Sequence, residues 1–253
     1  MSGMELSEVE SVLDRFVAEV TELLHPPALW AYGSLAMGDY QPGRSDLDLV
    51  AVLADPLSQE QTTQLTALHT RLLHEERAAE KLQCAYLPIS EIADTEVSHY
   101  NFAFARAIER PVSLVSRREL HLSGRVLSGA GPAELLPPVS DADLAAYIRH
   151  MLRTHYLAVV TKEPFTWFDD MWIDQVTLAY ARAAVTLHDG RLITKGEALE
   201  ELTRRGAPPR LVADIRQRRY GELRKAGPVW RTRRALMFRG YLRPAIRSLV
   251  AEG

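Results

Sequence analysis

Two short segments of this sequence carry residue types that suit phosphate and metal chemistry. Gly33 and Ser34 close the apolar run 28–34 (ALWAYGS), and after eleven further residues Asp46 and Asp48 open the apolar run 46–53 (DLDLVAVL). Side chains two apart on a β-strand point to the same face, so the two carboxylates can converge on one point. Two carboxylate ligands, completed by phosphate and water oxygens, suit Mg²⁺. The spacing therefore predicts a magnesium site at the start of the second run.

The Gly33-Ser34 pair predicts a phosphate-binding turn between a strand and a helix. Glycine permits close backbone approach, and free N–H groups with the Ser34 hydroxyl can hold a phosphate at a helix N-terminus. Arg44 and Ser45, in the intervening loop, are suited to contact a triphosphate. Each half alone also has a structural explanation, since Asp-X-Asp can mark a strand end and Gly-Ser a turn. The two halves in this order, each with strand-like apolar residues, favour nucleotide chemistry.

The elements that position these residues follow an α/β pattern over the first ninety or so residues. Apolar residues at helical spacing predict a helix over 5–24, ended by Pro26 and Pro27. Strands are expected at 28–34, 46–53 and 81–88, with a short helix after Ser34, a loop at 41–45 and a long amphipathic helix over 58–80.

The second half of the chain has a different, helical pattern. Residues 117–140 are dense in Gly, Pro and Ser and are interpreted as a connector. Helices are expected over 141–161, 171–188, 195–205, 208–224 and 229–250, with a loop at 162–170. We therefore predict a mixed-sheet α/β domain over 1–117, a linker over 118–140 and an all-helical bundle domain over 141–253.

Composition excludes several classes of protein. The 253 residues are 47% apolar and 25% charged, which argues against a disordered, collagen-like or disulfide-rich chain. The net charge of −3 argues against a general nucleic-acid binder. Cys84 is the only cysteine, which excludes an intramolecular disulfide. With an acidic N-terminal segment and no apolar run long enough to span a bilayer, the chain is expected in the cytoplasm.

At this point the motif resembles a known family. Gly33-Ser34 followed by Asp46-X-Asp48 resembles the signature of the DNA polymerase β-like nucleotidyltransferase superfamily. Within it, the chain is similar to the bacterial streptomycin/spectinomycin adenylyltransferases, over about residues 5–225. The segments that carry this narrower similarity are LAYAR (178–182), HDGRLITK (188–195) and, less specifically, GRVL (124–127).

The resemblance implies a two-domain enzyme that transfers AMP from ATP to a hydroxyl of an aminoglycoside or aminocyclitol drug. It implies Mg²⁺ held by Asp46 and Asp48, with ATP as co-substrate. Lys195 matches the family's lysine and would reach the nucleotide; a solvated lysine in a first helical turn is the alternative. No membrane or nucleic-acid partner is expected, and the expected assembly is a monomer or weak dimer.

The family places a glutamate on the third strand as the base that deprotonates the acceptor hydroxyl. This sequence has Gln83 in the matching frame LQCAYLP, and an amide can orient a hydroxyl but does not accept its proton. Glu80, three residues earlier, is expected on the opposite strand face. A catalytically impaired nucleotide-binding or regulatory protein is therefore the alternative function.

Acidic and aromatic residues near 167–174 are the candidates for acceptor binding. The resemblance suggests this role for Asp169, Asp170, Asp174 and Trp172, whereas an N-cap is the commoner role of Asp before a helix. Trp172 is alternatively a core residue.

A toxin–antitoxin-type nucleotidyltransferase acting on a protein or RNA is a third hypothesis. Arg149 with His155, and Arg182 with His188, match the loose Arg-X₄₋₆-His pattern of the helical RNases found in such systems. The segment 216–247 is rich in arginine. We interpret it as a solvated helix face complementing the acidic helix over 5–24, with phosphate or RNA binding as the alternative.

Overall fold

The computed structural model describes residues 6–162, 164–222 and 226–252. The chain divides into two compact units, Met1–Val139 and Ser140–Gly253. Each unit has its own core and is described by itself.

The first unit is built on a six-stranded mixed sheet with the strand order β5-β4-β3-β2-β1-β6. Strand β1 is antiparallel to β2 and β6, β2 is parallel to β3, and β4 is antiparallel to β3 and β5. The predicted mixed-sheet fold class is therefore confirmed. The strands are β1 (Ala28–Tyr32), β2 (Leu47–Leu53), β3 (Leu82–Pro88), β4 (His99–Ala103), β5 (Arg106–Arg110) and β6 (Arg125–Gly129).

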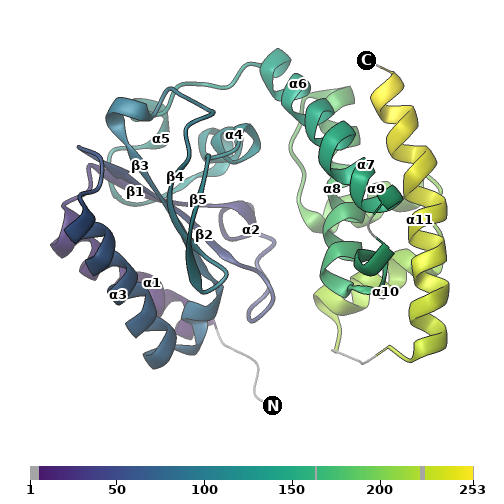
Figure 1. Ribbon diagram of the computed structural model, residues 1–253, viewed down its shortest axis with the longest axis horizontal. Helices are drawn as coiled ribbons and strands as arrows, with labels where there is room; N and C mark the ends of the chain where they lie inside the picture. The colour runs from purple at the N-terminus through teal and green to yellow at the C-terminus, as the bar shows by residue number, and fades with distance from the viewer. Residues whose placement is uncertain (1–5, 163, 223–225, 253) are drawn as a thin grey trace. The chain divides into compact units, whose positions relative to one another are not determined.

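Helices cover both faces of this sheet (Figure 1). On one face, α1 (Leu6–Leu24) and α3 (Gln59–Glu75) pack against the odd-numbered residues of β2, such as Leu49 and Ala51. On the other face, α4 (Leu114–Ser123) packs against Trp30, Val50 and Ala85 through Leu120. The short helices α2 (Gly33–Ala36) and α5 (Pro132–Leu135) complete the unit. Because side chains alternate along β2, Asp48 belongs to the face that α4 covers.

Two expectations for this unit are wrong. The helix expected over 58–80 ends at Glu75, and Glu80 lies in a 3₁₀ helix (Arg77–Lys81) rather than on a strand face. The expected linker over 118–140 contains most of α4, all of α5 and the edge strand β6, which pairs with β1. Its Gly and Pro residues are tight turns within the unit: Gly129 has a φ of 74°, and a Cβ there would lie 2.0 Å from the Pro27 carbonyl oxygen.

The described part of the second unit is a bundle of helices. They are α6 (Asp141–Met151), a π-helical turn (Leu152–Tyr156), α7 (Leu157–Lys162), a 3₁₀ helix (Pro164–Phe168), α8 (Asp170–Asp189), α9 (Lys195–Arg204), α10 (Pro209–Tyr220) and α11 (Pro228–Ala251). The predicted helices are confirmed except near some of their ends. Helix α10 ends at Tyr220, so residues 221 and 222 of the helix expected over 208–224 are not helical, and residues 223 and 224 lie outside the described residues. The loop expected over 162–170 contains the 3₁₀ helix Pro164–Phe168. Apolar residues at helical spacing, among them Ile173, Val176 and Phe238, form the core.

Candidate active site

Strand register brings the residues of the sequence motif to one end of one sheet face. Tyr32, the last residue of β1, lies opposite Asp48, and Asp48 lies beside Gln83 of β3. All three residues share the face of the sheet that α4 covers, because their strand neighbours Trp30, Val50 and Ala85 pack there. The sheet therefore aligns Tyr32, Asp48 and Gln83 across three adjacent strands.

The Gly33 backbone lies directly against the Asp48 carboxylate. Gly33 has a φ of 65°, and a Cβ at this residue would lie 2.7 Å from Asp48 Oδ2. Only glycine combines this left-handed backbone with so close an approach. Helix α2 begins at Gly33, and Ser34 follows as a partly exposed residue. The turn thus brings the backbone at Gly33 next to Asp48, and Ser34 is the next residue of the same turn.

Asp46 lies one residue before β2 and is open to solvent. Its side chain is 40% exposed, and its Oδ1 lies 3.8 Å from the ammonium of Lys81, which immediately precedes β3. A hard cation such as Mg²⁺ commonly takes one or two protein carboxylates and completes its shell with phosphate and water oxygens. An accessible Asp46 and an Asp48 beside an open glycine turn meet this requirement. Within the described ranges, no cluster of three or more His, Cys, Asp or Glu side chains is arranged to hold a metal.

The loop between the two halves of the motif is held closed by Ser45. This residue is buried; its Oγ accepts a hydrogen bond from Gln41 N at 3.0 Å, and its own N–H donates to Gln41 O at 2.9 Å. Arg44 is partly exposed on the same loop. Ser45 therefore has a structural role in shaping the loop, and its predicted contact with a triphosphate, like that of Arg44, stays a prediction.

Gln83 is buried and its amide faces a guanidinium. Gln83 Oε1 accepts a hydrogen bond of 3.4 Å from Arg110 Nη2, and Arg110 Nε donates to Asn101 Oδ1 at 3.3 Å. Asn101 Nδ2 in turn donates to the carbonyl oxygens of His99 and Arg110. The side chain of Arg110 thus reaches from β5 across β4 to β3. Arg110 could not be identified from the sequence, because this residue lies 27 residues after Gln83 and only the order of the strands brings the two side chains together.

The Tyr32 hydroxyl is buried close to these charges. Burial and the Asp48 carboxylate raise its pKa, whereas a hydrogen bond with Ser116 and the Arg110 guanidinium oppose that rise. Tyr32 therefore stays a neutral phenol at neutral pH. Both Asp48 and Arg110 lie within electrostatic range of this one side chain.

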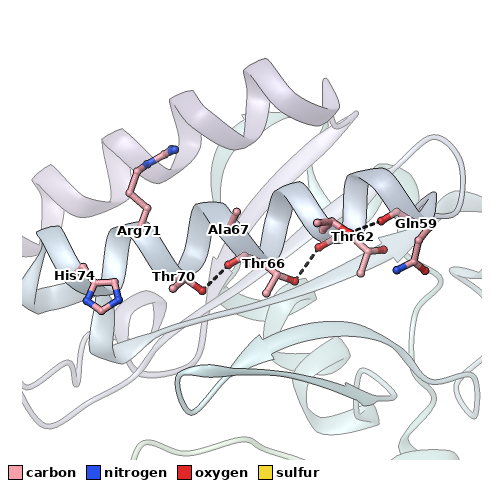
Figure 2. A pocket seen from close by; sticks show the side chains of 8 residues that line it. Gln59, Thr62, Thr66, Ala67, Thr70, Arg71 and His74 are labelled. Atoms are coloured by element: carbon pink, nitrogen blue, oxygen red, sulfur yellow. Dashed lines mark hydrogen bonds between the residues drawn. The ribbon is translucent and has the colours of Figure 1, made fainter.

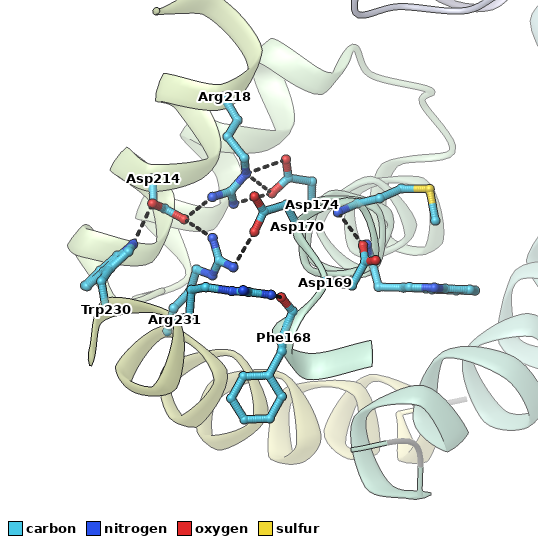
Figure 3. Close-up of polar contacts among 11 residues, drawn as sticks. Phe168, Asp169, Asp170, Asp174, Asp214, Arg218, Trp230 and Arg231 are labelled. Atoms are coloured by element: carbon cyan, nitrogen blue, oxygen red, sulfur yellow. Dashed lines mark hydrogen bonds and ion pairs between the residues drawn. The ribbon is translucent and has the colours of Figure 1, made fainter. Parts of the chain in front are cut away.

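In the second unit, the predicted acceptor-binding carboxylates have structural partners (Figure 3). Asp169 is the N-cap of α8, where its Oδ1 accepts from the backbone N–H groups of Met171 and Trp172. Asp174 accepts from Arg218 Nε at 2.9 Å, and Asp170 pairs with the buried guanidinium of Arg234. Roles for these carboxylates in binding an acceptor stay predictions.

The same ion-pair cluster changes the interpretation of the arginine-rich segment. Asp214 of α10 pairs with both Arg218 and Arg234, so two of these arginines join α8, α10 and α11. Burial raises the pKa of Asp174 despite its contact with Arg218. The expectation that the arginine-rich segment complements the acidic first helix is wrong for two glutamates of that helix. Glu10 pairs with Arg125 and Glu19 with Arg71, both within the first unit.

The remaining predicted residues of the second unit lie on helices. Trp172 is partly buried in the first turn of α8, and its ring centroid lies 5.8 Å from that of His155 in the π-helical turn. Lys195 is exposed at the start of α9, directly after the Thr194 cap. His188 Nδ1 lies 2.6 Å from Asp189 Oδ1 at the end of α8. The two histidines of the Arg-X₄₋₆-His pattern, His155 and His188, therefore lie in helical segments and contact neighbouring side chains.

A surface hollow elsewhere does not involve the motif. It runs along the outer side of α3 between Gln59 and His74 and is lined by threonines whose hydroxyls, such as those of Thr66 and Thr70, donate to carbonyls one turn earlier (Figure 2). None of the predicted site residues lines it. Among the residues described, no helix is long and apolar enough to cross a membrane.

Comparison with known proteins supports the fold and the kind of domain. Residues 13–111 match the family model of the nucleotidyltransferase domain. No curated protein matches the chain by sequence. Among solved structures, a spectinomycin adenyltransferase, AAD(9), from Enterococcus faecialis, determined with ATP and spectinomycin, is similar with a TM-score of 0.66 and 13% identity, over 96% of this chain and 98% of that one. The first unit thus contains a nucleotidyltransferase domain, and the predicted resemblance is confirmed for the domain and the fold.

Proposed function

We propose that this chain is a Mg²⁺-dependent nucleotidyltransferase that moves AMP from ATP to a hydroxyl of an aminoglycoside-like acceptor. The observation that carries the proposal is the contact between the Gly33 turn and Asp48, which would put a phosphate-binding backbone against a metal-binding carboxylate. The nucleotidyltransferase domain match and the likeness to a spectinomycin adenyltransferase support the type of reaction.

Each candidate nucleotide-binding or metal-binding residue has a distinct role in the proposal. Asp46 and Asp48 would hold Mg²⁺, which would neutralise phosphate charge. The acceptor hydroxyl oxygen would form a bond to the α-phosphorus as the bond to the leaving pyrophosphate breaks, and the hydroxyl proton would pass to solvent. The N–H groups at Gly33 and the Ser34 hydroxyl would hold the triphosphate. Arg44 would add a charged contact, with Ser45 keeping the loop that carries it closed. Lys195, which matches the family's lysine, would also bind the nucleotide.

Acceptor recognition is assigned to the start of α8. Trp172 offers a partly exposed aromatic ring, and Asp170 is 51% exposed at its side chain even while it pairs with Arg234. A partly exposed aromatic ring and exposed carboxylate oxygens, both in the first turn of α8, are groups that can bind a polyhydroxylated amine. Asp169 and Asp174 would support this surface through the α8 N-cap and the Arg218 ion pair.

Gln83 favours a second candidate function, nucleotide binding without turnover. The amide is buried beside Asp48 and does not accept a proton from an acceptor hydroxyl. A positioned base contributes roughly 10²–10⁴-fold to such reactions, so the rate expected without one is low.

The test is mass spectrometry after incubation of the protein with ATP, Mg²⁺ and an aminoglycoside panel that includes streptomycin and spectinomycin. The variant Asp46→Asn/Asp48→Asn removes the metal ligands. Asp55→Asn is the control, because Asp55 is an exposed carboxylate just past the opposite end of β2. An AMP-sized mass gain on one acceptor with the wild type and the control, absent with the double variant, supports transfer.

Binding of Mg²⁺·ATP by calorimetry separates the two candidates. Binding that the double variant loses, without any acceptor product, supports the nucleotide-binding protein. A wild-type protein that neither binds Mg²⁺·ATP nor forms product would refute both.

A further inference from the structure

Arg110 is a cation held at the candidate site by neutral groups. Both oxygens that accept from its side chain, Gln83 Oε1 and Asn101 Oδ1, belong to amides. Asn101 and Gln83 are themselves buried, 2% and 7% exposed, whereas Arg110 keeps partial exposure. These contacts fix the direction of the guanidinium and leave its charge unneutralised. A guanidinium has five N–H donors, and the bonds to Asn101 and Gln83 use one each of Nε and Nη2.

The cation lies on the flank of Asp48 opposite to the glycine turn. Gly33 follows β1, which pairs with one edge of β2, whereas Gln83 belongs to β3, which pairs with the other edge. Arg110 reaches Gln83 from β5, on the far side of β4. At this end of the sheet, the Gly33 turn, the Asp48 carboxylate and the Arg110 guanidinium therefore lie in that order across the strands.

We propose that Arg110 binds a phosphate-type oxyanion on the β3 side of Asp48; this rests on the proposed nucleotide function of the site. A planar guanidinium matches the geometry of a phosphate or carboxylate and binds either with two parallel hydrogen bonds. The oxyanion is a phosphate of the nucleotide or a separate phosphate-type anion bound beside it. Both sources present the same chemistry to Arg110.

Gln83 has a definite role in this arrangement. A carboxylate at residue 83 would form an ion pair with Arg110 and compete with the incoming oxyanion. The amide orients the guanidinium without competing for its charge. Consequently Gln83→Glu weakens oxyanion binding instead of creating a useful base.

The experiment compares Arg110→Gln and Arg110→Lys with the control Arg106→Gln, which removes an equal charge from the exposed start of the same strand. One arm measures Mg²⁺·ATP binding by calorimetry. The other titrates inorganic phosphate into protein saturated with a non-hydrolysable ATP analogue and follows the arginine Nε–H resonances by NMR, the Arg110 signal being assigned by its loss in Arg110→Gln. Thermal midpoints verify that each variant is folded.

We expect the Arg110 resonance to shift when the ATP analogue or phosphate is added, and Arg110→Gln to lose about ten- to hundredfold in one of the two affinities. Loss of Mg²⁺·ATP affinity identifies a nucleotide phosphate as the ligand, and loss of phosphate affinity alone identifies a separate phosphate-type anion. Arg106→Gln leaves the affinities for Mg²⁺·ATP and for phosphate within about twofold of the wild type, as expected for an exposed surface charge. Arg110→Lys keeps part of the affinity that Arg110→Gln loses.

An Arg110 resonance that phosphate does not move, with both affinities unchanged in Arg110→Gln, would overturn the inference. Failure of the proposed function has a different signature, since the wild type would then not bind Mg²⁺·ATP. The inference is tested in that case too, because the phosphate titration repeated without nucleotide still reports on Arg110.

Discussion

Replacing Gly33 by alanine tests whether this turn exists to approach Asp48. A Cβ at residue 33 would lie 2.7 Å from Asp48 Oδ2, about 0.7 Å short of ordinary van der Waals contact. The left-handed φ of 65° adds a backbone cost of about 1–2 kcal/mol for a residue with a Cβ. Relief of the contact moves the carboxylate, and a displacement near 1 Å costs a catalytic or binding group about 10²-fold. We expect Gly33→Ala to lower Mg²⁺·ATP affinity about ten- to hundredfold.

Gly38 supplies the matched control. It has a similar φ, 75°, and a Cβ there would meet no heavy atom within 4 Å. Gly38→Ala therefore carries the same backbone cost without touching Asp48. Urea unfolding should show similar losses of stability in the two variants, whereas calorimetry with Mg²⁺·ATP should show a large loss only in Gly33→Ala. Equal nucleotide affinities in the two variants would refute the argument, because the contact with Asp48 would then have no consequence.

Three further predictions concern the scaffold. Gly129→Ala should destabilise the protein by about 3 kcal/mol or more in urea, because its Cβ would overlap the Pro27 carbonyl and its φ is 74°; an unchanged midpoint would contradict this. Asp169→Ala should cost about 1 kcal/mol through the lost α8 N-cap while Asp169→Asn costs little; AMP transfer lost in Asp169→Asn at unchanged stability would instead indicate acceptor binding. Burial lowers the pKa of His69 to about 3 from 6.5, so its neutral form is favoured on folding and stability falls by about 1.4 kcal/mol per pH unit below pH 6.5. Urea midpoints measured from pH 7 to pH 5 should decline less steeply in His69→Phe.

The Gly33-Ser34 and Asp46-X-Asp48 motif and most elements could be predicted from sequence because their determinants are local. The helical spacing of Val9, Val12, Phe16 and Val20 gives α1, and the apolar run after Asp46 gives β2. Edge strand β6 could not be found this way. Its residues 125–129 include exposed positions and lie among Gly, Pro and Ser, and they form a strand only because β1 offers a free edge for pairing.

The sequence predicts the part of the candidate site formed by residues close in sequence, but not the contacts that depend on the order of the strands or the packing of the helices. Asp46, Asp48, Gly33 and Ser34 are close in sequence, and their geometry follows from a strand–turn–helix and a neighbouring strand. The environment of Gln83 depends on β4 and β5, which follow later in the chain, so its partner Arg110 had no sequence indication. The α8 carboxylates were predicted as ligands since nothing local reveals that Arg218 and Arg234 come from α10 and α11.

These long-range partners change what the absence of a base at residue 83 means. Viewed alone, Gln83 is an amide at the position where the resembled family has a glutamate, and substituting glutamate would be expected to supply the missing base. Beside Arg110, a carboxylate would instead be held ionised in an ion pair, where its pKa falls and its ability to take a proton falls with it. Gln83→Glu is therefore expected to leave AMP transfer slow, whereas combining it with Arg110→Gln would free the carboxylate to act as a base. A Gln83→Glu single variant that transfers AMP faster than the wild type would show that Arg110 does not control this position.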